Sequence, residues 1–235
     1  MLKRIISLCT TFVMLLAVLS PAASAAHLGN NQSFEQQIQD LSINYQDEAY
    51  RAENGISDIE ITSEMRKAVS ASCNDERGNQ LPVKISMTVR QVELHDPSAN
   101  LFDRLSGNDM VDAYVLTAVA SEDVMQTGSN SNSIGATIIM SMYWTDYFGL
   151  NNVLTKIYTA WEITSGGTTM NSNEVTYGNT SNFMTYSGRK QNVANYSFWN
   201  NINYTAFSFW TKFTCTFKNG SNTQTFNVRI ESSNW

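Results

Sequence analysis

The stretch from residue 133 to residue 164 constrains the fold more than any other part of this sequence. In its first half, every second residue is apolar and would lie on one side of a strand: Ile134, Ala136, Ile138, Met140, Met142 and Trp144. After a Gly-Leu-Asn-Asn break at 149–152, the second half places Val153, Ile157, Trp161 and Ile163 on one face. Alternation with period two, rich in β-branched and aromatic residues, is typical of β-strands. The stretch therefore predicts a long β-hairpin at the centre of a β protein.

Shorter alternating runs on both sides of this hairpin predict a mostly β protein, an antiparallel β-sandwich of about eight strands. The other expected strands cover residues 56–62, 83–89, 112–120, 174–178, 204–217 and 224–231. The segment 63–73 fits either a strand or one amphipathic turn of helix. A change of parity after residue 89 predicts a β-bulge near Arg90. Residues 179–203 are rich in Asn and Ser, and we expect a loop there.

The first twenty-five residues have the three parts of a secretory signal peptide. Lys3 and Arg4 form a positive start, residues 5–19 form an apolar run, and Ala-Ser-Ala follows at 23–25. The apolar run falls short of the roughly 20 residues that span a bilayer, which argues against a retained anchor. We therefore expect cleavage after Ala25, a secreted extracellular protein, and no membrane span after signal cleavage.

Composition then divides the chain into a polar, acidic lead-in at 26–56 and a β-sandwich domain at 57–235. In the lead-in, Phe34, Ile38, Leu41 and Tyr45 have helical spacing. This spacing fits either a short docking helix or a disordered segment.

Charge limits the classes of partner that the chain can bind. Without Lys3 and Arg4 the mature chain has thirteen basic and twenty-one acidic residues, a net charge of −8. Seventeen of the acidic residues lie in 27–125, whereas 126–235 holds four acidic and six basic residues. Binding to nucleic acid or to an anionic membrane needs clustered Lys and Arg, so we expect neither.

Two cysteines, Cys73 and Cys215, remain in the mature chain. In an exported protein such a pair is first interpreted as a disulfide. The alternative is two buried thiols, each acting as a small apolar residue. A bond would close a loop of about 140 residues and stabilise the fold by on the order of 5 kcal/mol. It requires the two Cα atoms to lie within about 7 Å of each other.

Residues suited to catalysis are few. His27 and His95 are the two histidines, and the chain has no Gly-x-Ser-x-Gly motif and no phosphate-binding glycine loop. Asp146 and Glu162 lie in the central hairpin, but its expected register separates them by roughly 20 Å, too far for a glycosidase pair. We expect no catalytic residues, no cofactor and no metal site.

The expected strand 204–217 is the most aromatic part of the chain. Its core-facing parity carries Phe207, Phe209, Phe213, Cys215 and Phe217. The opposite, polar parity carries Tyr204 and Trp210, which together with Trp199 are candidates for stacking against a sugar ring. The same rings could instead pack beneath the 179–203 segment.

Together these features predict a secreted, non-catalytic β protein with a binding or surface-interaction role. Its expected partner is an unknown protein or a glycan. One alternative is a carbohydrate-binding module that uses exposed aromatic side chains. A second alternative is a glycan-acting hydrolase, which would need two carboxylates about 5–10 Å apart in a cleft.

Overall fold

The computed structural model describes residues 36–37, 44–96, 99, 101–122, 134–146, 152–180, 185–195, 197–200 and 208–233. The expected signal peptide, its cleavage site, Tyr204 and most of the lead-in lie outside these residues.

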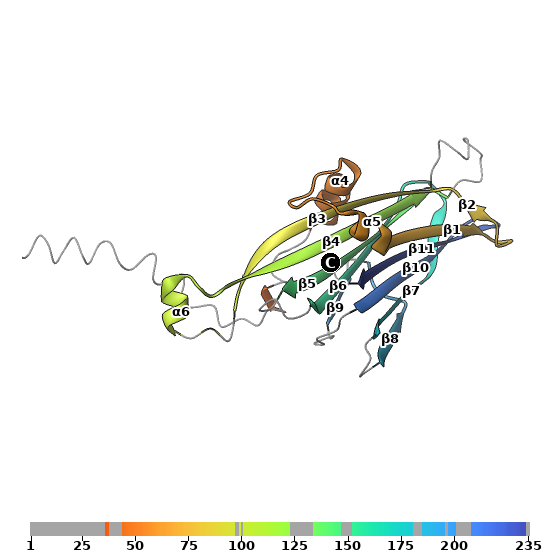
Figure 1. Ribbon diagram of the computed structural model, residues 1–235. Helices are drawn as coiled ribbons and strands as arrows, with labels where there is room; N and C mark the ends of the chain where they lie inside the picture. Colours follow the sequence, from red (N-terminus) through yellow and green to blue (C-terminus); the bar gives the residue numbers. More distant parts are fainter. Residues whose placement is uncertain are drawn as a thin grey trace, which may run out of the picture.

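Within the described residues the chain forms an antiparallel β-sandwich (Figure 1). The strands are β1 (Val69–Asp75), β2 (Gln80–Leu81), β3 (Val83–His95), β4 (Met110–Glu122), β5 (Ala136–Asp146), β6 (Asn152–Ile163), β7 (Thr168–Thr180), β8 (Thr185–Gln191), β9 (Ser197–Asn200), β10 (Ser208–Asn219) and β11 (Asn222–Ser233). The helices are α4 (Tyr45–Glu53), α5 (Ser63–Ala68) and α6 (Leu101–Ser106).

The strands are divided between two sheets. One sheet has six strands in the order β2-β1-β11-β10-β7-β8, and the other has five in the order β3-β4-β5-β6-β9. The fold class predicted from alternation is confirmed, with eleven strands in the described part of the chain rather than about eight. The central hairpin is also confirmed, because β5 pairs with β6 from Ala136 opposite Ile163 to Asp146 opposite Asn152.

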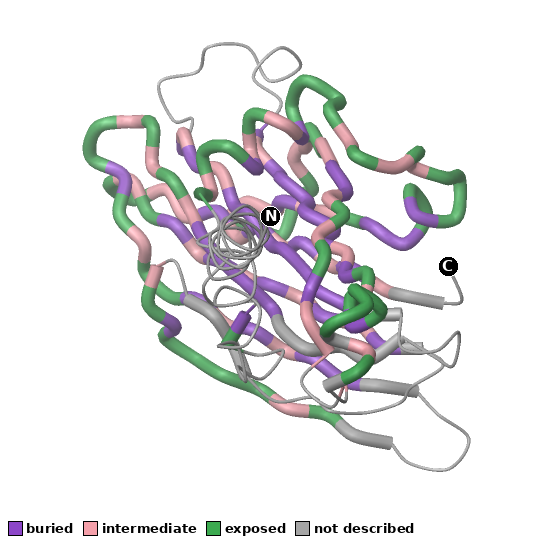
Figure 2. The backbone as a smooth tube through the Cα atoms, turned by 90° about the vertical axis from the view of Figure 1, so that its left-hand side faces the viewer, coloured by how far each residue is buried: buried purple, intermediate pink, exposed green. Residues whose placement is uncertain are grey.

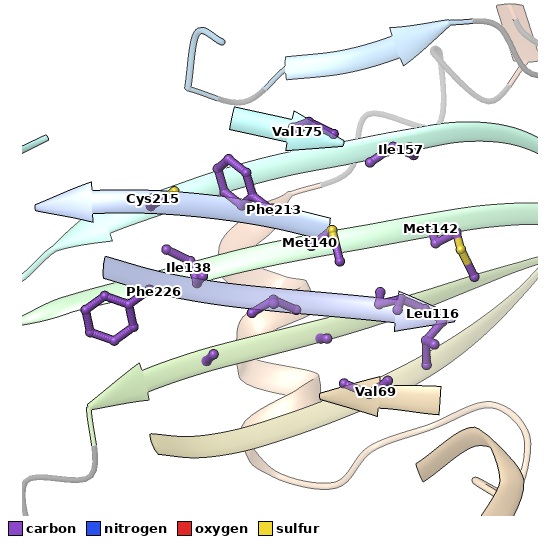
Figure 3. Close-up of a cluster of buried hydrophobic side chains, with 14 of the residues drawn as sticks. Val69, Leu116, Ile138, Met140, Met142, Ile157, Val175, Phe213, Cys215 and Phe226 are labelled. Atoms are coloured by element: carbon purple, nitrogen blue, oxygen red, sulfur yellow. The ribbon is translucent and has the colours of Figure 1, made fainter. Parts of the chain in front are cut away.

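The main core lies between the two sheets. Figure 3 shows side chains from both sheets in this cluster, among them Met140 of β5, Phe213 of β10 and Phe226 of β11. In Figure 2 the buried residues run through the strands, while exposed residues lie mostly around the outside. Each large apolar side chain buried here stabilises the fold by about 1.5–3 kcal/mol. The alternating parity of β5 and β10 is therefore the pattern that forms the sandwich.

Helix α4 covers part of the opposite face of the five-stranded sheet, over β3 and β4 (Figure 1). Ala52 of this helix belongs to a second apolar cluster, whose other buried members lie on the strands beneath: Leu94, Ala113, Val115, Val119, Ile139, Tyr143, Tyr158 and Ala160. The helix begins after Asn44, whose side chain accepts a hydrogen bond from the backbone N–H of Gln46 at 3.0 Å. Such a cap satisfies one of the free N–H groups of the first turn.

The bulge predicted near Arg90 is wrong. The pairing of β3 with β4 continues without a shift from Val89 opposite Leu116 to Arg90 opposite Val115. Val89 belongs to the core between the sheets, whereas Leu94 belongs to the cluster beneath α4. The parity changes along β3 because different faces of the strand are covered at its two ends.

Residues 56–62 are not a strand, contrary to the alternating pattern. This segment instead lies along the edge of β3. The N–H of Asp58 donates to the carbonyl of Val89 at 2.9 Å, and the Val89 N–H donates to Ser57 Oγ at 3.1 Å. The Gln91 N–H donates to Asp58 Oδ2 at 3.1 Å. Two side chains and one backbone N–H thus occupy edge groups of β3 that would otherwise be open to pairing with another chain.

Two further segments differ from the prediction in detail. Residues 63–73 contain both alternatives, because α5 is followed directly by β1. Residues 179–203 are not simply a loop, since they contain β8 and β9, which form edges of the two sheets. An edge strand has one neighbour and a polar outer face, so its sequence lacks a long apolar alternation. No helix within the described ranges has the length and apolar character needed to cross a bilayer.

Candidate functional site

The outer side of the six-stranded sheet is polar because β10 alternates. Phe213, Cys215 and Phe217 are buried in the core, so Lys212 and Thr214 lie on the opposite side. Strand register extends this pattern across neighbouring strands. We call this surface the polar face and define it by two adjacent rows: Ser72, Asn227, Thr214, Glu174 and Gln191, and Ser70, Arg229, Lys212, Thr176 and Arg189.

Hydrogen bonds between side chains fix the first row. Thr214 Oγ1 donates to Asn227 Oδ1 at 2.9 Å, and Gln191 Nε2 donates to Glu174 Oε2 at 3.3 Å. Because each of these residues stands on a paired strand, the row is held by the sheet as well as by its own bonds. It offers a ligand polar groups whose positions are set in advance.

A cavity of about 320 Å³ opens on the polar face where β7, β8 and β10 lie side by side. Its lining consists of Ser172, Asn173, Glu174, Arg189, Gln191, Asn192 and Thr214. All seven are polar residue types with hydroxyl, amide, carboxylate or guanidinium groups, and the carbon atoms of their side chains form the rest of the wall. The cavity therefore suits a ligand with many hydrogen-bonding groups.

Glu174 is the carboxylate of this cavity. Arg189 Nε donates to Glu174 Oε2 at 2.5 Å, and the guanidinium also forms an ion pair with the same oxygen. The hydrogen bond from Arg189 lowers the pKa of Glu174, against a smaller opposing effect of burial, and Gln191 and Lys212 lower it further. Glu174 is therefore a hydrogen-bond acceptor at neutral pH.

The cavity wall after β8 is anchored by an amide side chain. The N–H of Val193 donates to Asn173 Oδ1 at 2.6 Å, and Asn173 Nδ2 donates to the Val193 carbonyl at 2.9 Å. Asn192, which precedes this anchor, has a positive φ of 52°. Asn tolerates this left-handed conformation better than most residues.

A second amide continues the anchoring toward the other sheet. The N–H of Trp161 on β6 donates to Asn195 Oδ1 at 3.0 Å, and Asn195 Nδ2 donates to the Trp161 carbonyl at 3.0 Å. The segment that crosses from β8 to β9 is thus attached to both sheets, and the cavity wall is held firmly in place.

Of the three aromatic residues predicted to bind sugar, the two that the structure describes lie on different sheets. Trp210 lies half-buried on the outer side of β10, opposite Glu231. The guanidinium of Arg229 lies over the Trp210 ring, 4.8 Å from its centroid, and also bonds Glu231 Oε2. Trp199 is on β9, in the other sheet, and Tyr204 lies outside the described residues.

The predicted disulfide between Cys73 and Cys215 is wrong, because both cysteines are free and buried. Cys73 on β1 and Cys215 on β10 lie opposite the same residue, Phe226 of the intervening strand β11. Two strand spacings amount to about 10 Å, more than the roughly 7 Å that a disulfide allows. Each thiol packs as a small apolar residue in the core between the sheets.

The side chains considered for catalysis lie elsewhere. Asp146 and Glu162 are at opposite ends of the β5–β6 hairpin, opposite Asn152 and Thr137. His95 Nδ1 is 3.0 Å from Asp109 Oδ2, at the start of β4. In the described part of the chain, no group of three or more His, Cys, Asp and Glu side chains is arranged to hold a metal ion.

Sequence reasoning missed Arg189, Gln191 and Asn173. Arg189 and Gln191 are two residues apart, as partners on one face of a strand must be, and this spacing was the signal available. It was obscured because Gly188 and the surrounding polar residues give 185–191 the composition of a loop.

Compared with protein-family models, with curated proteins and with solved structures, the chain matches none of them.

Proposed function

We propose that this chain is a secreted, non-catalytic binding protein whose polar face binds a glycan. The observation that carries the proposal is the polar cavity lined by Glu174, Arg189, Gln191 and Thr214. Most small-molecule sites are lined mainly by apolar side chains, which suit apolar ligands. A cavity whose lining residues are all of polar types suits a ligand covered in hydroxyl groups, which both donate and accept hydrogen bonds.

The side chains of the cavity match this chemistry in kind. Glu174 accepts hydrogen bonds from sugar hydroxyls, and Arg189 donates to ring or hydroxyl oxygens. Gln191 and Thr214 can do both. All four stand on paired strands, so a sugar binds without first ordering a loop, which favours affinity.

Trp210 has a secondary role in this proposal. It lies four residues from Thr214 on β10, about 13 Å along the strand. Because Arg229 covers one face of its ring, a sugar that reaches this point meets an indole–guanidinium pair rather than a bare aromatic ring. The cavity, and not a row of exposed aromatic side chains, is the centre of the proposed site.

The test is affinity electrophoresis of the mature protein in gels that contain soluble polysaccharides, followed by calorimetry on those that retard it. Glu174→Gln removes the negative charge of the cavity and should weaken binding by about tenfold, the effect expected for a hydrogen bond to a charged group. Glu162→Gln is the matched control, since Glu162 is exposed on the other sheet.

The proposal is supported if Glu162→Gln still binds the polysaccharide and Glu174→Gln does not, with equal melting temperatures for the two variants. Failure of the unaltered protein to bind any polysaccharide would overturn it. Equal binding by both variants would place the site away from the cavity.

A further inference from the structure

Like charges face each other across the second row of the polar face. Arg229 on β11 lies directly opposite Lys212 on β10. Lys212 lies in turn opposite Thr176 on β7, and Arg189 on β8 follows in the same row. Three cations therefore share one row of four neighbouring strands.

This arrangement is unfavourable for the fold by itself. Side chains directly opposite on antiparallel strands are close neighbours, and like charges in that position destabilise the pair. Glu231 compensates Arg229, because its Oε2 accepts from Arg229 Nε at 3.1 Å and from Nη2 at 2.9 Å. Glu174 compensates Arg189 in the same way.

Of these three cations, Lys212 is the one that forms no ion pair within the described part of the chain. Glu174 attracts the Lys212 ammonium electrostatically, but its ion pair is with Arg189. Lys212 stands two residues from Thr214 on the same side of β10, so the two side chains are about 7 Å apart. A lysine without an ion pair of its own thus lies beside the cavity, in a mature chain of net charge −8.

Like charges are normally avoided at directly opposite positions of paired strands. Where they occur without a packing reason, the position is expected to bind a ligand. We infer that the glycan bound by the polar face is anionic, and that Lys212 binds one of its carboxylates beside the cavity. This inference rests on the proposed glycan-binding function and names the class of glycan. A ligand carboxylate at Lys212 relieves the repulsion from Arg229, whereas a neutral sugar leaves it in place.

The experiment compares polygalacturonate, which carries a carboxylate on each sugar, with its uncharged, fully methyl-esterified form, by calorimetry at low ionic strength. The unaltered protein should bind polygalacturonate about tenfold more tightly, the effect of one charge-assisted hydrogen bond. Lys212→Gln should remove this preference and keep the affinity for the ester. Lys212→Arg should retain the preference.

Lys218→Gln is the matched control. Lys218 is an exposed lysine on the same strand, opposite Thr223 and three rows from Lys212. This variant should keep the preference. Lys212→Gln should also melt at the same or a higher temperature than the unaltered protein, because the substitution removes a repulsion from the free protein.

The outcomes separate this inference from the function on which it rests. Binding of neutral polysaccharides with no preference for the acid form, or an unchanged preference in Lys212→Gln, overturns the anionic class and leaves glycan binding standing. Binding of neither polymer nor any neutral polysaccharide overturns both.

Discussion

Arg90 donates from Nη1 to Oε1 of Glu48 at 2.7 Å, and this bond joins strand β3 to helix α4 through a carboxylate that has no exposed surface. The other carboxylate oxygen accepts from Thr117 Oγ1 at 3.2 Å, and Thr117 is bonded to Ser141 at 2.7 Å. A buried charge is tolerated only when it is paired and hydrogen-bonded. The docking of α4 therefore depends on this group of side chains.

Removing the cation should cost more than removing the carboxylate. Arg90→Ala leaves Glu48 buried without its partner, and we expect a loss of about 3–5 kcal/mol in the free energy of unfolding. Glu48→Ala should cost less, since the Arg90 side chain is about one-third exposed and can be solvated. Urea unfolding measures both.

The double variant Glu48→Met with Arg90→Met is the companion measurement, because replacing a whole buried ion pair with apolar residues is often neutral. Glu53→Gln, an exposed residue at the end of the same helix, should change the unfolding free energy little. Equal losses for Arg90→Ala and Glu48→Ala would contradict the asymmetry.

The cysteines should be unreactive in the native protein. Burial raises the pKa of the Cys73 thiol to about 12, so its thiolate is scarcely populated at neutral pH. Burial also raises the pKa of Cys215. Thiol reagents should label neither residue in the folded protein and both in unfolded, non-reduced protein, and finding no free thiol after unfolding would contradict the structure.

Cys73 should also give stability a particular dependence on pH. Its folded pKa is raised above the ordinary value of 9.0, so the folded state holds its proton after the unfolded state has lost it. The stabilising contribution is complete below about pH 9 and is lost as the pH rises toward about 12. Cys73→Ala should show a shallower decline over this range in denaturant unfolding.

Gly188 should not tolerate a side chain. It lies opposite Tyr177 on β7, and a Cβ at this position would overlap the tyrosine ring. Gly188→Ala should therefore displace Tyr177 and cost about 1–3 kcal/mol, as overpacking typically does. Gly166→Ala, where a Cβ meets nothing within 4 Å, is the control and should change the melting temperature little.

Glycan binding should persist into acid. Because Arg189 lowers the pKa of Glu174, this carboxylate stays ionised down to a pH below its ordinary value of 4.5. Affinity should be constant from neutral pH to about 4.5 and fall below it, as protonation removes the acceptor. Measured with the neutral methyl ester, which has no carboxylate of its own to titrate, Glu174→Gln should show no such fall, and a decline in the unaltered protein that begins near pH 6 would point to a different group.

Alternation predicted the strands that face a single core. Phe213 and Phe217 share a parity with nothing polar between them on that face, and burial in one interior imposes such a pattern. β3 did not follow this rule because α4 covers its far end, a contact between distant segments that no local window contains. The short edge strand β8 was missed because one neighbour and a polar outer face leave no apolar repeat.

The candidate site was predictable in its residue types but not in its geometry. Cys215 was correctly assigned to the core-facing parity, yet its distance from Cys73 depends on which strand lies between them. In the same way, Glu174 was visible as a carboxylate, whereas its pairing with Arg189 requires the register of β7 and β8. Strand order and register are properties of the whole sheet.

The pairing of β1 with β11 has a consequence for the time at which the chain can fold. Val69 lies opposite Ile230 and Asp75 opposite Gln224, so the first long strand is paired with the last, about 150 residues later. Contacts at such separation slow folding, because the entropy of closing the loop is lost before the contact forms. A chain synthesised from its N-terminus keeps β1 without β11 until the end of the chain is made, and this delay would suit the secretion that we propose, because export channels receive unfolded polypeptides.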